Sequence, residues 1–208
     1  NGRVIQYGAL PPDYIMVIRS FGGAFFDEQV TKAVLDSPDT RKAFQFLLDL
    51  QNRYRVVPTM QELEGEDKFK SGVQMFMTNR IGMFIAPSFI LATLDEIKEF
   101  KWEVAPIPVR QGYPRVSLFA TGNVAISSQC KNPEVAWEFA KFIAGREGTA
   151  IFGRGRNCIP PIKEVAYQTF VVPPPDNIRV YVDAIEYALP ILKVTWADEF
   201  WNTVVKIE

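Results

Sequence analysis

An apolar run followed by a proline, a serine and a helical pattern is the feature that most restricts the fold. Ile81 to Ala86 has the length and apolarity of a buried strand, and Pro87-Ser88 separates it from a helix expected over 89–97. A strand joined by a tight loop to a helix is the repeating unit of α/β proteins. We therefore expect an α/β fold.

Two further helices have clear start signals. Ser37-Pro38-Asp39 supplies an N-cap serine, a proline at the first helical position and an acid in the first turn. Apolar residues then recur at three- and four-residue spacing, which predicts an amphipathic helix that ends near Val57-Pro58. Asn132-Pro133-Glu134 gives a similar signal for a second helix, with Gly145 as its stop.

The remaining elements are less strongly marked. Residues 14–18 fit a helix or a strand, 25–35 fit a small hairpin, and Asn79 fits a turn. Trp102 to Pro108 is strand-like, but its prolines cannot donate to a ladder, so we expect an edge strand or a segment that leaves the sheet. A polar connector over 110–115 follows it. Strands are also expected at 4–7 and 122–127, and helices at 146–152, 162–169, 177–189 and from Thr195 to the chain end.

Composition excludes several classes of function. The 208 residues carry 23 basic and 24 acidic side chains, so neither a nucleic-acid surface nor a polybasic membrane patch is indicated. The absence of histidine removes Ser/His/Asp and Cys/His nucleophiles, histidine metal ligands and histidine general bases. We expect no metal and no cofactor. The given chain shows no signal peptide, and its longest apolar stretch, 84–94, is shorter than the about 20 residues that span a bilayer.

The two cysteines, Cys130 and Cys158, match neither a CxxC motif nor a four-ligand zinc site. They could form a disulfide in an oxidising compartment, or they could be ordinary small buried residues. The sequence leaves both alternatives open.

Four segments, taken in order, resemble the extracellular solute-binding proteins of bacterial carbohydrate ABC importers, the family that includes maltose-binding protein. Residues 76–84 resemble the family's Phe-x-x-Gly-Lys-x-Ala-Met stretch, and Pro87-Ser88-Phe89 stands where the family usually has Gly-Ser-Trp or Gly-Pro-Trp. Residues 102–108 resemble its Trp-x-Val-Ala-x-x-Pro strand. Residues 121–127 followed by 131–143 give the closest match, and a glycine loop ending in Pro160 comes next.

The resemblance implies a periplasmic-binding-protein-like fold of type II, with two α/β lobes joined by crossover strands and roughly the first third of the usual sequence absent. By that comparison residues 1–118 form most of the second, C-terminal lobe. Residues 119–187 form the hinge crossover and helices of the first lobe, and 188–208 return to the second lobe. Hinge closure is implied near Pro108 and Thr121.

The implied function is that of a non-enzymatic component of an ABC importer, which captures a carbohydrate or other small polar solute and delivers it to permease subunits in the membrane. The implied location is periplasmic or extracellular, with any membrane anchor in a segment outside this chain.

Sugars are bound by aromatic faces under their C–H patches and by polar groups that pair with their hydroxyls. The resemblance makes Phe89 a stacking candidate, because the family has a tryptophan at this position; the alternative is a core residue. Trp196, which precedes the last helix, stands where the family often has a site aromatic. Tyr14, beside Pro11-Pro12-Asp13, could line the cleft or be a half-buried surface residue.

Three polar candidates complete the expected site. Ser88 could offer its hydroxyl or the N–H groups of a helix start, or act only as an N-cap. Gly122 would let backbone approach a ligand and Asn123 can both donate and accept, although a structural turn would also explain this pair.

Two alternatives to solute binding stay open. A carbohydrate-processing enzyme would need two carboxylates that face each other, whereas those at 95–99 and 134–138 are expected on solvated faces. A ligand-free interaction domain would use the apolar stripe of Trp137, Phe139 and Phe142, which is more simply a core face. If no other part of the protein covers that stripe, we expect it to promote self-association.

Overall fold

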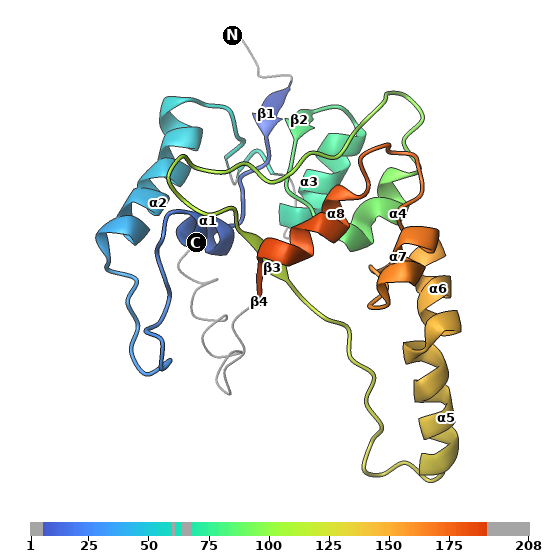
Figure 1. Ribbon diagram of the computed structural model, residues 1–208. Coiled ribbons are helices and arrows are strands. Elements are labelled where there is room, and N and C mark those ends of the chain that lie inside the picture. Colours follow the sequence, from blue (N-terminus) through green and yellow to red (C-terminus); the bar gives the residue numbers. More distant parts are fainter. Residues whose placement is uncertain (1–5, 60, 64–67, 191–208) are drawn as a thin grey trace.

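The computed structural model describes residues 6–59, 61–63 and 68–190. A π-helical turn at Asp49–Arg53 and 3-10 turns at Ser88–Ile90 and Ala184–Tyr187 accompany the regular elements. In chain order (Figure 1) these elements are β1 Tyr7–Ala9, α1 Tyr14–Ser20, α2 Pro38–Leu48, α3 Lys68–Met77, β2 Ile81–Met83, α4 Leu91–Leu94, β3 Ser117–Phe119, α5 Pro133–Ala144, α6 Arg146–Arg154, α7 Lys163–Thr169, α8 Val180–Asp183 and β4 Ala188–Pro190.

The described strands pair in parallel, in two sheets of two strands each. Strand β1 lies beside β2 with Tyr7 opposite Ile81, and β3 lies beside β4 with Ser117 opposite Ala188. Parallel strands need a crossover connection, and helices form much of each one here. The α/β class expected from the sequence is confirmed.

The core consists of several small apolar clusters between helices and strands. One joins β1 and β2 to Leu63 and Met75, and another joins α1 to α2 through residues such as Ile18 and Ala43. A third surrounds Ile90, Leu94 and Ile97, and a fourth surrounds Leu91, Phe170 and Ile178. Two of these clusters therefore fix the segment that follows β2.

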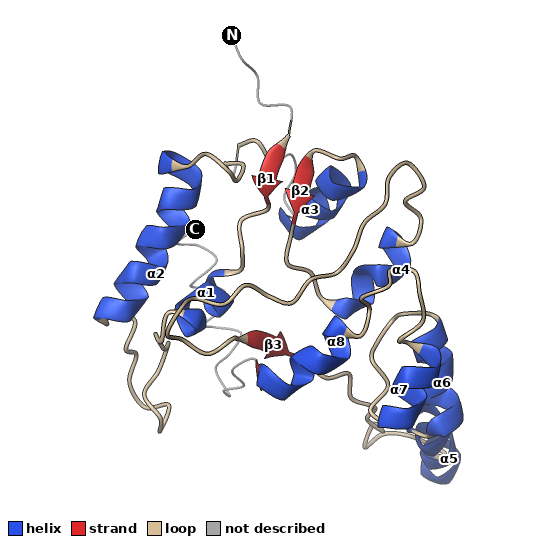
Figure 2. Ribbon diagram, turned by 45° about the horizontal axis from the view of Figure 1, so that its top comes forward, coloured by secondary structure: helices blue, strands red, loops and turns tan. Residues whose placement is uncertain are grey.

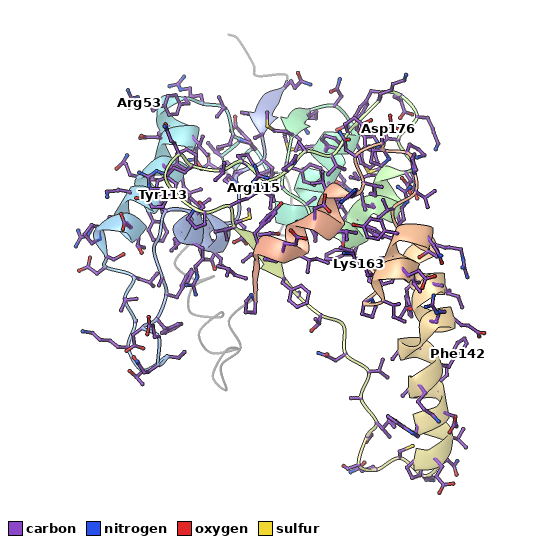
Figure 3. The ribbon with its side chains drawn as sticks, viewed as in Figure 1. Arg53, Tyr113, Arg115, Phe142, Lys163 and Asp176 are labelled. Atoms are coloured by element: carbon purple, nitrogen blue, oxygen red, sulfur yellow. The ribbon has the colours of Figure 1, made fainter. Side chains whose placement is uncertain are left out.

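Helices α5, α6 and α7 stand apart from the β1–β2 sheet in both Figure 1 and Figure 2, and we call them the arm (residues 133–169). An extended segment, 120–132, connects β3 to the arm. Helix α5 exposes most of its apolar side chains, and Figure 3 labels one of them, Phe142. The exposed set is Val135, Trp137, Phe139 and Phe142.

The strongest helix start signals are confirmed, but α2 ends at Leu48 and the π-helical turn after it at Arg53, before the stop expected near Val57-Pro58. Helix α2 begins after Ser37, whose Oγ accepts a hydrogen bond from the Thr40 amide at 3.2 Å, with proline in its first turn. Helix α5 begins at Pro133 and ends before Gly145. Residues 14–18 are helical because Asp13 caps α1. The hairpin expected over 25–35 is reduced to one antiparallel bridge, between Phe26 and Ala33.

One expected strand is wrong, and one open alternative is decided. Residues 102–108 do not form an edge strand and are irregular, which fits the alternative of a segment that leaves the sheet, since their prolines supply no N–H to a ladder. Residues 122–127 are also irregular and exposed, because no described strand lies beside them to take up their backbone hydrogen bonds. Extended backbone without a partner strand does not form a ladder.

Other boundaries differ from expectation. The first strand runs over Tyr7–Ala9, whereas a strand was expected at 4–7, of which residues 4 and 5 lie outside the described part. Helix α3 was not indicated by the sequence patterns used above, and the helix expected over 177–189 is reduced to α8 and a 3-10 turn before β4. The last helix, expected from Thr195, lies outside the described residues.

Among the described residues, Cys130 and Cys158 are free thiols, Cys130 half-buried and Cys158 exposed. The same residues contain no cluster of side chains that could hold a metal ion. None of their helices combines the length and the apolarity that crossing a membrane requires.

Candidate functional site

The candidate site lies at the carboxyl edge of the β1–β2 sheet. Because β1 and β2 are parallel, the chain leaves both strands at the same edge, and the Leu10 amide donates to the Met83 carbonyl at 3.0 Å just past β1. From there one segment runs to α1 and the other to Ser88. Open parallel sheets bind ligands beyond the carboxyl ends of their strands.

On the first segment, Asp13 fixes the position of Tyr14. The Asp13 carboxylate accepts hydrogen bonds from the backbone N–H groups of Ile15 and Met16 at 2.8 and 3.3 Å, which caps α1. Tyr14 is half-buried, and its ring meets that of Phe25 edge to face with centroids 6.2 Å apart. Part of the Tyr14 ring is thus held by the core beneath α1.

On the second segment, Ser88 and Phe89 open the 3-10 turn before α4. Ser88 is half-buried, and its side chain is not the N-cap of this turn, which begins after Pro87. The Phe89 side chain is 58% exposed, whereas Ile90 and Leu91 beside it are buried. The alternative of a core residue does not describe Phe89, and an exposed ring at this edge has the form that stacking on a sugar needs.

Gly122 and Asn123 lie on the extended segment that leaves β3. Both are exposed, and a Cβ added at Gly122 would meet no atom within 4 Å. Gly122 also lies outside the left-handed region, so the local backbone does not require glycine here. A tight turn is therefore not the reason for the glycine, and the role of this pair at a ligand stays a prediction.

Trp196 lies outside the described residues, so its predicted role stays a prediction as well. Of the expected site residues, Tyr14 lies at the start of α1 on the segment that follows β1, Ser88 and Phe89 lie on the segment that follows β2, and Gly122 and Asn123 lie on the extended segment 120–132.

Sequence patterns indicate only a polar connector over 110–115, but its arginines make specific contacts. The guanidinium carbon of Arg110 lies 4.4 Å from the ring centroid of Phe21 and 4.2 Å from that of Tyr113. Figure 3 labels Tyr113, beside α2, and Arg115, nearer the middle of the molecule. Nη1 of Arg110 and Nε of Arg115 are buried without a hydrogen-bond partner. The Arg-x-x-Tyr-x-Arg spacing of residues 110–115 is the sequence signal for these arginine contacts.

The carboxylates near α4 do not form a glycosidase pair. Asp95 is half-buried rather than fully solvated: partial burial is the main cause that raises the pKa of its carboxyl, while the positive charges of Arg156 and Lys98 lower it. Its neighbours Glu96 and Glu99 are exposed. Because Asp95 is bound by an arginine and has no described acid facing it, this cluster lacks the arrangement that glycoside cleavage requires.

These features define a class. Parallel strands joined by helices, with an extended segment leading from β3 to a further group of helices, agree with the α/β architecture of a type II periplasmic binding protein. The model of the bacterial extracellular solute-binding protein family matches residues 13–175, and the chain belongs to this family.

Solved structures agree on the fold. An ABC substrate-binding protein of Listeria monocytogenes in complex with cycloalternan has a TM-score of 0.83 and 21% identity, covering 96% of this chain and 51% of its own. The maltose/maltodextrin-binding domain of Bdellovibrio bacteriovorus bound to maltotriose has a TM-score of 0.74 and 18% identity, over 97% of this chain and 53% of its own. An acarbose-binding receptor of Streptomyces glaucescens has a TM-score of 0.78 and 14% identity, over 93% and 50%. The chain thus spans about half the length of these relatives.

Proposed function

We propose that this chain is part of a non-enzymatic solute-binding component of an ABC importer, which captures a sugar or oligosaccharide and delivers it to a membrane permease. The observation that carries the proposal is the exposed Phe89 ring at the carboxyl edge, on a segment anchored by buried Ile90 and Leu91. Family membership and the sugars named for three structural relatives support it. The family also supports a periplasmic or extracellular location.

The proposed cleft has the Tyr14–Phe89 edge on one side and the segment 120–126 on the other. Residues 1–118 are assigned to the second lobe, 119–187 to the crossover and first lobe, and 188–208 to the return. Solute would be held between the lobes and would favour the closed arrangement through its higher affinity for that state.

A thermal-shift screen of the full-length parent protein tests this function. A ligand that binds only the folded state raises the melting temperature by mass action, so we expect a selective shift with one saccharide family. Maltose, maltotriose, cycloalternan and acarbose form the first panel.

Variants then place the site. Phe89→Ala and Trp196→Ala should reduce the shift, whereas Phe44→Ala should preserve it, because Phe44 is an exposed phenylalanine on α2 (42% exposed) away from the carboxyl edge. Turnover of the bound sugar would indicate an enzyme. The absence of any shift would overturn the sugar proposal and direct the screen to other polar solutes.

A further inference from the structure

The segment that connects β2 to α4 (Figure 1) alternates between packed and exposed side chains. Phe84 and Ala86 are half-buried and pack against the apolar cluster around Ile90, and the ring centroid of Phe84 lies 4.9 Å from that of Phe76. Successive side chains of an extended backbone point to opposite sides. The residues between the packed ones therefore form a row on the other side. We call this the apolar row, and its members are Met83, Ile85 and Pro87, all exposed.

The chemistry of this row is not that of a surface left to water. A segment with one packed and one solvated side normally alternates apolar with polar residues. Here the exposed side is apolar as well, with Met83 63% and Ile85 38% exposed. The sequence carries no charged residue between Arg80 and Asp95. A contiguous exposed apolar surface marks a binding site, and an uncharged one suits an uncharged occupant.

The row is continuous with the candidate site. It begins at the last residue of β2, where the Met83 carbonyl accepts the hydrogen bond from the Leu10 amide just past β1. It ends two residues before Phe89, which is 58% exposed. The apolar row thus prolongs the surface on which Phe89 is expected to stack a sugar ring.

The length of the row bears on the size of the occupant. At about 3.3 Å per residue of extended chain, Met83 and Pro87 are on the order of 13 Å apart. This is longer than a single sugar ring, whose C–H face one aromatic side chain can cover. Together with Phe89, the row fits the C–H faces of at least two linked rings.

We propose that the apolar row is a second contact surface for the solute, and that Met83 and Ile85 select an uncharged oligosaccharide over a single sugar. This inference rests on the proposed function and adds the size class of its solute. Phe89 contacts one ring, and the row contacts the ring or rings linked to it. The flexible, polarisable side chain of Met83 adapts to such a face.

Isothermal titration calorimetry of the full-length parent protein tests the row with glucose, maltotriose and cycloalternan. We expect the parent to bind an oligosaccharide more tightly than glucose. Met83→Ser and Ile85→Ser should each raise the Kd for that oligosaccharide about fivefold, because less apolar surface is buried against it, and should leave the Kd for glucose at its parent value. Phe89→Ala should weaken both sugars. Leu48→Ser is the matched control and should change neither, because Leu48 is an equally apolar residue, 54% exposed, on α2.

Melting temperatures without ligand separate binding from folding. Those of Met83→Ser and Ile85→Ser should match that of Leu48→Ser, because all three residues are exposed. A clear drop below the control would mean that another part of the parent protein covers the row, and would overturn the inference. An oligosaccharide Kd that stays at its parent value in both variants would also overturn it, and would leave the proposed function standing. A parent that binds none of these saccharides overturns the proposed function and this inference together.

Discussion

The guanidinium carbon of Arg115 lies 5.7 Å from the ring centroid of Tyr187. Arg115 stands two residues before β3, and Tyr187 directly precedes β4, which pairs with β3 in parallel. The contact therefore joins the starts of two strands that are far apart in the chain.

We expect this contact to stabilise the fold through a cation–π interaction of about 0.5–1 kcal/mol. Arg115→Ala and Tyr187→Leu should each lower the free energy of unfolding in urea, and a double-mutant cycle should return a coupling of that size. Arg53→Ala is the control, since Arg53 stacks on its exposed neighbour Tyr54. A coupling of zero would mean that Arg115 and Tyr187 are merely adjacent.

Two helix starts of the same sequence type should respond differently to alanine. Ser37 accepts a hydrogen bond from the Thr40 amide, whereas Asn132, which also precedes a proline, makes no side-chain capping bond. Ser37→Ala should cost about 1 kcal/mol of unfolding free energy, and Asn132→Ala clearly less. Chemical denaturation of both variants checks the difference, and equal losses would argue against the cap at Ser37.

Gly23 and Gly122 form a second matched pair. A Cβ at Gly23 would lie 2.6 Å from Thr40 Oγ1 and 3.1 Å from the Ile18 carbonyl oxygen, while one at Gly122 would meet nothing within 4 Å. Gly23→Ala should therefore destabilise by about 1–3 kcal/mol through overpacking. Gly122→Ala should leave the melting temperature unchanged. If Gly122 lines the proposed cleft, the same variant should weaken sugar binding, which separates a role in binding from a role in folding.

Glu62 gives a pH dependence with a defined sign. Hydrogen bonds from the Tyr7 hydroxyl and from the backbone and side chain of Thr59 lower the pKa of Glu62 below its ordinary value of 4.5. A lowered folded-state pKa contributes stability that is present above the ordinary value and is lost as the pH falls through the folded-state value. Glu62→Gln should therefore flatten the acid limb of stability against pH. Identical acid limbs in urea titrations of parent and variant would contradict this.

How far the sequence predicts this structure depends on whether the signal is local. Ser37-Pro38 and Asn132-Pro133 start helices because caps and φ restrictions act within one turn. Asn79 adopts a left-handed φ of 56° at the expected turn. The strand expected over 122–127 fails because a strand needs a partner, and composition does not say whether one is present. Helix α3 was missed although Val73 and Phe76 have three-residue spacing, because the acidic stretch before it contains no recognisable helix-start signal.

The candidate site follows the same division. The strand, loop and helix pattern places Ser88 and Phe89 just after a strand, and the resemblance to the family's Gly-Ser-Trp stretch makes them site candidates. The exposure of Phe89 could not be predicted, because it depends on Ile90 and Leu91 packing into two different apolar clusters. The Arg156–Asp95 contact, 61 residues apart, has no local signal at all.

The apolar face of α5 gives the last prediction. Val135, Trp137 and Phe139 are 70%, 56% and 61% exposed, and a neighbouring hollow of about 570 Å³ is lined by Val124, Ile126 and Phe139 among others. These apolar side chains are neighbours on one face rather than scattered singly, and a contiguous exposed apolar patch favours association. The 208-residue chain by itself should therefore form concentration-dependent oligomers in sedimentation velocity and bind an apolar dye. Phe139→Glu should reduce both effects, while Phe44→Glu on α2 should not. A compact monomer that binds no dye would show that this face is covered within the chain itself.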